Sequence, residues 1–276
     1  MTSLAHEPER STSNHLELVA TEVAVLAARF VRSQFGGAVS AGTKSTDTDV
    51  VTHTDMASED LVRVELARRC PGSTIVGEEA GRSLGSNNVG WIVDPIDGTV
   101  NFLYGLPVVS VSIAATLGGQ VVAGAVTDVL SGETFCASIG NGATCDGAPI
   151  FASGANQLGQ ALVGTGFAYD AGAREREAQL LTKVLPVCRD IRCMGSAALN
   201  LCWVAAGRLD GFYERSIQTY DYAAGALIAA EAGASVELPA ANETDLTLAA
   251  APEIFPQLSA AVANQPGPAD SAGYRE

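Results

Sequence analysis

Two carboxylates follow an apolar run in the segment GWIVDPIDGTVNF, residues 90–102. Asp94 ends the run, and Pro95 cannot donate a ladder hydrogen bond from its own nitrogen. Asp97 and Gly98 form a strong turn pair. The pattern predicts two acids on a rigid turn at the carboxyl end of a strand, where α/β folds tend to bind ligands. An ordinary turn, with both aspartates capping local backbone groups, is the structural alternative.

Other acids stand at similar boundaries. Glu78 and Glu79 follow the strand-like STIVG, and Asp221 opens a helical segment after YERSIQTY. Taken singly, such acids are usually solvated, or they stabilise the start of a helix. Strand pairing could bring the three groups together, and a cluster of carboxylates needs cations. Oxygen ligands suit magnesium or manganese.

Three rival chemistries fit the sequence poorly. The histidines at 6, 15 and 53 are too few and too scattered for a zinc site or a catalytic triad. No G-x-S-x-G elbow is present. The run Asp47-Thr48-Asp49-Val50-Val51 fits the D-x-D-x-V pattern of aspartyl-phosphate phosphatases, but a loop-like segment precedes it where that nucleophile needs a buried strand.

Net charge and cysteine usage limit the binding partners and the cellular location that we expect. The chain of 276 residues has a net charge of −15, which opposes direct binding to nucleic acid or anionic membranes. A phosphorylated substrate would also be repelled unless bound cations reverse the local field. The first fifteen residues lack an apolar signal core, and the six cysteines form no C-x-x-C pair. We expect reduced thiols and a cytoplasmic location.

The elements that must position the acids follow from periodicity. Apolar residues from Leu16 to Phe30 recur at helical spacing, and Asn14 with Glu17 resembles a capping box. A Thr/Asp-rich loop is expected at 40–55 and a helix at 56–70. Residues 98–127 carry no charge but alternate like strands around a Gly118-Gly119 turn, so no membrane span is expected.

From about residue 155, strands alternate with helices, as in an α/β half. Ser196 is the expected N-cap of one helix, and Asp221 and Gly233 the expected start and stop of another. We therefore predict a disordered tail at 1–13, an α+β half at 14–150, an α/β half at 151–264 and a disordered tail at 265–276.

Together these motifs resemble the inositol monophosphatase family of magnesium-dependent, lithium-sensitive phosphatases. The family signature D-P-I/L-D-G-T-x-N-F is matched at every place from Asp94 to Phe102. GEE lies upstream, and YDYAAG lies downstream with Tyr220 where the family usually has tryptophan. GTGF and GSAAL further resemble its bacterial suppressor-type members. The resemblance runs from about Lys44 to about Gly233, and it implies a layered αβαβα sandwich.

The resemblance also implies roles for individual residues. Metal would be held by Glu78, Asp94, the backbone carbonyl of Ile96, Asp97 and Asp221. The catalytic residues would be Thr99 and Asp55, which orient the attacking water, together with Glu78. The substrate would meet Asp97, Gly98, Thr99, Ala197, Glu214 and Asp221. Lys44 matches a family lysine near the site, and a solvated loop lysine is its structural alternative.

The implied reaction is hydrolysis of myo-inositol 1-phosphate with two or three Mg²⁺ ions, for which Mn²⁺ could substitute. Fructose-1,6-bisphosphate, histidinol phosphate and 3′-phosphonucleotides remain alternative substrates. A protein-binding factor in transcription or ribosome biogenesis is the alternative of another class. The resemblance also implies a homodimer, and the expected apolar helices at 194–206 and 222–232 offer more apolar surface than one half can bury.

Overall fold

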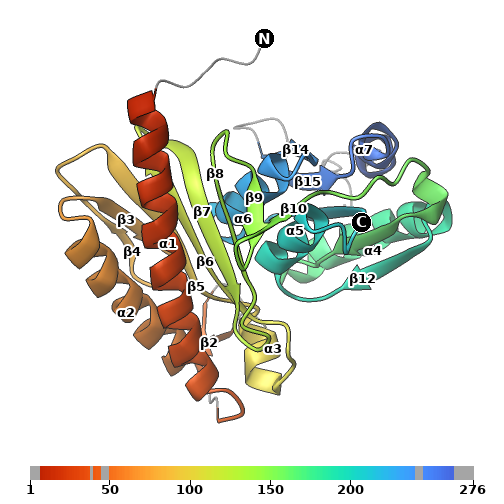
Figure 1. The fold of residues 1–276 in the computed structure, drawn as a ribbon. Helices are drawn as coiled ribbons and strands as arrows, with labels where there is room; N and C mark the ends of the chain where they lie inside the picture. Colours follow the sequence, from red (N-terminus) through yellow and green to blue (C-terminus); the bar gives the residue numbers. More distant parts are fainter. Residues whose placement is uncertain (1–6, 38–39, 45–49, 240–244, 264–276) are drawn as a thin grey trace, which may run out of the picture.

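The computed structural model describes residues 7–37, 40–44, 50–239 and 245–263. Five layers alternate along the molecule, as Figure 1 shows. Helices α1 and α2 cover one face of a large sheet, and α5 and α6 cover its other face. A smaller sheet packs on the far side of α5 and α6, with α4 and α7 outside it. The predicted αβαβα sandwich is confirmed.

The large sheet belongs to the N-terminal half. Its strand order is β10-β9-β8-β7-β6-β5-β3-β4, antiparallel except for the parallel pair β3 and β5. The strands are β3 (Thr74–Gly77), β4 (Gly81–Ser83), β5 (Val89–Asp97), β6 (Ser110–Leu117), β7 (Gln120–Asp128), β8 (Thr134–Ser138), β9 (Ala143–Cys145) and β10 (Ala148–Ile150). The uncharged stretch thus forms the central hairpin of the sheet, as predicted. No helix within the described residues is long and apolar enough to cross a membrane.

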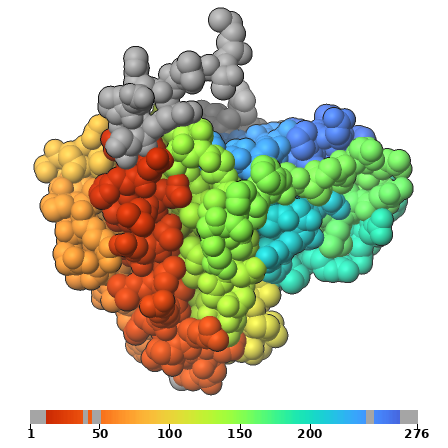
Figure 2. Space-filling view, viewed as in Figure 1, coloured from red at the N-terminus to blue at the C-terminus, as the bar shows by residue number. Residues whose placement is uncertain are grey.

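Helix α1 (Glu7–Ser33) begins earlier than predicted. Residues 7–13 are helical, so the expected tail is wrong over that part, and residues 1–6 lie outside the described residues. Asn14 and Glu17 lie inside the helix and do not cap it. They bind Ser138 at the end of β8 instead. Figure 2 shows α1 running down one side of the molecule next to α2.

The segment expected to be a loop at 40–55 contains regular structure. Strand β1 (Ser40–Thr43) pairs with β2 (Val50–Thr52), and α2 (His53–Arg69) begins directly after β2. Thr52 is the N-cap of α2. Most of the run from Asp47 to Val51 lies outside the described residues or at their edge, so the aspartyl-phosphatase alternative is not tested by the structure.

Strand β5 continues past Asp94, where the sequence predicted a turn. Asp94 pairs with Ser112 of β6 and Asp97 with Ser110, and the register shifts between them. Pro95 lies in this bulge, where a missing backbone N–H does not break the ladder. The bulge brings two aspartates of one strand to the same end of the sheet.

The smaller sheet belongs to the C-terminal half and has strand order β12-β11-β13-β15-β14. Strands β12, β11 and β13 are parallel, and β15 is antiparallel to both β13 and β14. Its strands are β11 (Leu162–Thr165), β12 (Asp190–Cys193), β13 (Gly211–Arg215), β14 (Ser235–Glu237) and β15 (Leu246–Ala250). The helices of this half are α4 (Ala171–Val184), α5 (Ala197–Ala205), α6 (Thr219–Glu231) and α7 (Phe255–Ala263).

Helices α5 and α6 pack against each other between the two sheets. Most of their apolar side chains, including Leu199, Leu201 and Ile228, are buried in one cluster with Phe135 and Phe212, while Trp203 and Tyr222 are only partly buried. The apolar surface left for a dimer partner is therefore smaller than the sequence suggested, and the homodimer stays a prediction. All six cysteines are free thiols, in keeping with the prediction. Residues 265–276, predicted to be a tail, lie outside the described residues.

Candidate active site

Three chain segments bring their acids to one end of the large sheet. Because β3 runs parallel to β5, with Gly77 beside Val93, Glu78 lies next to Asp94. The Glu78 N–H donates to the Val93 carbonyl at 3.2 Å, which holds this neighbourhood together. Helix α6 approaches from the other half, and Ser112 Oγ donates to the Tyr220 carbonyl at 3.4 Å. Asp221 therefore starts α6 close to Asp94.

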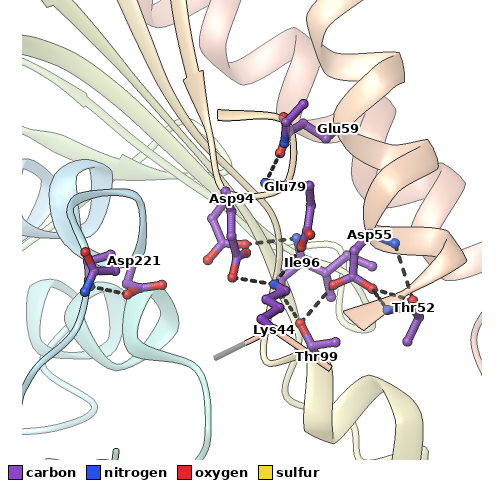
Figure 3. Close-up of polar contacts among 12 residues, drawn as sticks. Lys44, Thr52, Asp55, Glu59, Glu79, Asp94, Ile96, Thr99 and Asp221 are labelled. Carbon is purple, nitrogen blue, oxygen red and sulfur yellow. Dashed lines mark hydrogen bonds and ion pairs between the residues drawn. The ribbon is translucent and has the colours of Figure 1, made fainter. Parts of the chain in front are cut away.

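Asp94 lies at the centre of this group and is 2% exposed. Its Oδ1 accepts the Ile96 N–H at 3.0 Å across the bulge (Figure 3). Burial and the neighbouring charges of Glu78, Asp97 and Asp221 raise the pKa of Asp94 well above its usual range. A carboxylate in such surroundings is stabilised in its charged form by a cation.

Asp97 joins the two halves of the molecule. Its carboxylate accepts hydrogen bonds from the hydroxyls of Ser110 and Ser196 and from the N–H groups of Ala197 and Ala198. The last three donors form the start of α5, where the helix dipole favours negative charge. Burial raises the pKa of Asp97, although these donors oppose the shift.

Asp221 does not have the N-cap position that the sequence predicted. Gln218 is the N-cap of α6, and Asp221 at the third helical position accepts its N–H in a capping box. Burial and the charge of Asp97 raise the pKa of Asp221 to about 8. Burial likewise raises the pKa of Glu78 to about 7, against the opposing effect of Lys44.

Lys44 is not a solvated loop lysine. Its Nζ lies 2.6 Å from a carboxylate oxygen of Glu78 and 2.6 Å from one of Glu79, and its side chain is 22% exposed. Burial alone would lower the pKa of Lys44, but the two glutamates raise it above its usual value. The ammonium group therefore stays charged beside the predicted metal ligand Glu78.

Thr99 and Asp55 form the predicted hydrogen-bonded pair. Thr99 Oγ1 donates to Asp55 Oδ1 at 2.9 Å and also lies 3.0 Å from the Ile96 carbonyl oxygen (Figure 3). Asp55 is the third residue of α2, and its Oδ2 accepts the Thr52 N–H at 2.9 Å. One carboxylate thus caps the helix with one oxygen and holds Thr99 with the other. Burial raises the pKa of Asp55.

Gly98 connects the strand to the short helix α3 (Thr99–Tyr104). Its φ of 97° is in the left-handed region, and an added Cβ would lie 2.9 Å from the Val108 carbonyl oxygen. Only glycine fits this position without strain. Among the described residues, no side-chain hydrogen bond caps the start of α3, so its first N–H groups can receive an anion.

Two further predicted substrate contacts, Glu214 and Ala197, lie on the C-terminal half. Glu214 is the second-last residue of β13, and burial together with the charges of Asp221 and Asp97 raises its pKa well above its usual range. Ala197 is the first residue of α5 and is buried. Arg215, the last residue of β13, pairs with Asp245 and donates to the Val262 carbonyl, so it links this strand to the end of α7.

The donor set fits a hard cation in its chemistry, since all the gathered groups offer oxygen. Within the described part of the chain, however, no three acid, histidine or cysteine side chains already form a ready metal-binding group. The oxygens are engaged elsewhere: those of Asp97 with α5, and an oxygen of Glu78 with Lys44. Small rotations of these side chains would be needed to converge on an ion.

Sequence reasoning missed several residues that hold this site. Ser110 and Ser196 fix Asp97, Thr52 fixes Asp55, and Ser58 Oγ donates to the Pro95 carbonyl at 3.1 Å. Glu59 is 1% exposed and accepts the Glu79 N–H at 2.7 Å. The sequence did not mark Glu59 either, because the buried face of α2 also contains Asp55 and Ser58 beside Val62 and Leu66.

The fold is that of a known class, since the profile of the inositol monophosphatase family matches residues 13–269. The chain belongs to that family and is an inositol-phosphate phosphatase, a phosphoric monoester hydrolase. The predicted family resemblance is confirmed, and it extends beyond the motifs that suggested it.

Individual relatives agree. The inositol-1-monophosphatase SuhB of Mycobacterium tuberculosis is 47% identical over 95% of this chain and 96% of its own length. The structure of M. tuberculosis SuhB superposes with a TM-score of 0.79 at 45% identity, covering 94% of this chain and 98% of that one. The extragenic suppressor protein suhB of Bartonella henselae gives 0.84 at 30% identity, covering 90% and 98%.

Proposed function

We propose that the chain hydrolyses myo-inositol 1-phosphate to inositol and phosphate in an Mg²⁺-dependent reaction. The observation that carries the proposal is the meeting of Glu78, Asp94, Asp97 and Asp221 beside the Thr99–Asp55 pair. Four acids gathered with raised pKa values in a chain of net charge −15 would repel a phosphate by themselves. Cations are needed to make such a site attract it.

The residues that would hold two or three Mg²⁺ ions are Glu78, Asp94, Asp97, Asp221 and the Ile96 carbonyl. When bound, such ions activate water and neutralise the departing oxygen of the alcohol. Mn²⁺ prefers similar oxygen ligands and is a possible substitute.

Thr99 can orient the attacking water. Its single hydroxyl proton can go either to Asp55 or to the Ile96 carbonyl, at 2.9 and 3.0 Å. Donation to Asp55 leaves the Ile96 carbonyl oxygen available to a cation and leaves the threonine lone pairs free to accept a proton from water. Asp55 thus sets the direction of the hydroxyl, and this is the catalytic role that we propose for the pair.

The substrate would bind between the two halves. The N–H groups that follow Gly98 would receive phosphate oxygens. Asp97, Asp221, Glu214 and the start of α5 at Ala197 would face the hydroxyls of the polyol, since carboxylates are strong acceptors of hydroxyl protons.

Removal of metal should abolish turnover. We expect phosphate release to stop in EDTA and to return when Mg²⁺ is added in excess, because the proposed site contains oxygen ligands only. Full activity in metal-free buffer would contradict the proposal.

Lithium added to the same assay is expected to inhibit at the position of Asp94, Asp97 and Asp221, with an affinity that Tyr220 could alter.

The metal-free protein should lose stability as pH rises. The folded-state pKa values of Glu78 and Asp221, about 7 and about 8, lie above their ordinary values. The contribution of these two groups to the free energy of unfolding is therefore complete below pH 4 and is lost as pH rises through 7 and 8. Each proton released lowers the free energy of unfolding by up to about 1.4 kcal/mol per pH unit.

Thermal unfolding between pH 5.5 and 8.5 measures this effect. In EDTA the midpoint should fall across the range, and Mg²⁺ should raise it more at pH 8.5 than at pH 5.5, because binding displaces protons. The Asp221→Asn variant should show a shallower fall. A midpoint that rises with pH in EDTA would contradict the assignment of these shifts.

A substrate panel tests the function itself. Purified protein with Mg²⁺ should release phosphate faster from myo-inositol 1-phosphate than from fructose-1,6-bisphosphate, histidinol phosphate or a 3′-phosphonucleotide. A different order would keep the chemistry and replace the substrate. Absence of phosphate release from every compound would favour the other class of function.

The alternative function, a protein-binding factor in transcription or ribosome biogenesis, is supported by one comparison. The Nus factor SuhB of Salmonella typhimurium is 38% identical over 72% of this chain and 75% of its own length. We favour catalysis because every acid of the predicted metal set is present and gathered at one place. A protein partner remains the alternative, and direct nucleic-acid binding is not expected at a net charge of −15.

A homodimer remains part of the proposal chiefly through the family resemblance, since most apolar side chains of α5 and α6 are buried within one chain. We expect sedimentation equilibrium at micromolar concentration to give about twice the chain mass of 28.3 kDa. A mass of one chain would refute it. The cytoplasmic location likewise stays a prediction of the sequence.

A further inference from the structure

Glu59 of α2 is a buried acid that none of the roles above uses. It is 1% exposed, and its carboxylate faces the turn that carries Glu78 and Glu79 (Figure 3). The Glu79 N–H donates to its Oε2 at 2.7 Å, and the Ala80 N–H donates to its Oε1 at 3.0 Å. Both oxygens thus bind the backbone immediately after Glu78.

Arg63, one helical turn later, binds Glu59 and also contacts the same turn. Its Nε lies 2.7 Å from Glu59 Oε1, and its terminal nitrogens bind the Gly81 carbonyl and Ser83 Oγ. We call Glu59 and Arg63 the turn clamp. Together they hold backbone groups of residues 79–81 and the side chain of Ser83 at the end of β4, so the turn is attached to α2.

Gly77 shows how closely the clamp fits. A Cβ at this position would lie 2.3 Å from Glu59 Oε1, so no larger residue can stand there while the carboxylate keeps its place. Gly77 lies directly before Glu78. Glycine at position 77 therefore leaves the space that the Glu59 carboxylate needs to approach the backbone.

A purely structural role explains Glu59 poorly. The carboxylate adds negative charge beside Glu79, whose pKa is raised first by burial and then by neighbouring acids that include Glu59. Well-packed apolar residues often replace buried ion pairs without loss of stability. A charge kept beside another acid, Glu79, is better explained by the turn that its hydrogen bonds position.

We propose that Glu59 is a positioning residue for the metal site: it fixes the turn so that Glu78 presents its carboxylate beside Asp94. The inference rests on the proposed metal-dependent function. Outer hydrogen-bond partners of metal ligands act in this way, and their loss typically weakens metal binding about 10- to 100-fold.

The test is Mg²⁺ binding measured by titration calorimetry, without substrate, on the wild type and on Glu59→Gln. Glutamine keeps one oxygen acceptor but presents an NH₂ group to the other backbone N–H. We expect Mg²⁺ affinity to fall about 10-fold, with kcat recovering toward wild type at saturating Mg²⁺. The matched control is Glu65→Gln, which removes a surface pair with Arg68 and Arg69 on the same helix.

Arg63→Gln provides a second variant if Glu59→Gln does not fold. It keeps the backbone bonds of Glu59 and loses the link to Gly81, so a smaller loss of Mg²⁺ affinity is expected. Wild-type Mg²⁺ affinity in every variant that folds would overturn the inference, whatever the change in thermal midpoint. A wild-type protein that binds no Mg²⁺ would instead overturn the proposed function.

Discussion

Replacing Asp94 by asparagine should reduce kcat by at least about 1,000-fold, because charge stabilisation by bound cations contributes several kcal/mol and about 1.4 kcal/mol corresponds to tenfold in rate. Asp94 lies between Glu78, Asp97 and Asp221 and interacts with all three. Removal of its charge would therefore weaken every cation held by the group. Phosphate release at saturating Mg²⁺ is the measurement.

The same variant should fold normally. Asparagine keeps the Oδ1 that accepts the Ile96 N–H, and it removes a buried charge whose pKa is raised. We expect the thermal midpoint in EDTA to equal or exceed that of the wild type. Asp128→Asn is the matched control, since Asp128 is a buried acid outside the proposed metal set that accepts the Leu130 and Ser131 N–H groups through Oδ1. Near-normal kcat in Asp94→Asn would refute the metal assignment.

Thr99→Val should lower kcat by about 100-fold while leaving Mg²⁺ affinity nearly unchanged, because a positioned proton acceptor contributes about 10²- to 10⁴-fold. Valine has a similar shape but lacks the hydroxyl that links Asp55 to the water site. Single-turnover phosphate release and Mg²⁺ calorimetry on the same preparation separate the two effects.

Thr99→Ser keeps the hydroxyl and should retain most of the activity. Thr127→Val is the control for removing a buried threonine hydroxyl, because Thr127 pairs only with Thr134 between β7 and β8 among the described contacts. If Thr99→Val and Thr127→Val lost activity equally, the role of the Thr99 hydroxyl in orienting water would be wrong.

Local patterns predicted much of the fold. The alternation of Val109, Val111 and Ile113 with serines marked β6, and glycines at 118 and 119 marked its hairpin with β7. Ser196 was recognised as the N-cap of α5, where its Oγ accepts the Leu199 N–H. These features depend on neighbours in the sequence, which a single chain displays directly.

Features that depend on distant partners were not predictable in this way. The bulge in β5 arises from its register with β6, so the sequence showed Pro95 but not the pairing around it. Helices α2 and α6 each begin two residues before Asp55 and Asp221, because Thr52 and Gln218 take the N-cap positions. Lys44 gained its partners across 34 residues of sequence.

The metal set came from the family motif and not from local physics. Spacing alone left each acid open to a capping role, and Asp55 and Asp221 do cap their helices as third residues. Asp55 and Asp221 differ from ordinary capping residues because each also contacts a residue that is distant in the sequence. Such contacts depend on how elements distant in the sequence pack together, which periodicity does not reveal.

The hydrogen bonds from the start of α5 to Asp97 limit where this chain could be divided or recombined. Glu78, Asp94 and Asp97 come from one half and Asp221 and Glu214 from the other, so neither half contains a complete reaction centre. The connection at 151–157 has no regular structure and could be cut or lengthened. The junction at Asp97 and residues 196–198 could not, because it sets the two parts in register. Two separately expressed fragments would therefore regain turnover only through reassembly at that junction, which would make enzyme activity a direct report of their docking.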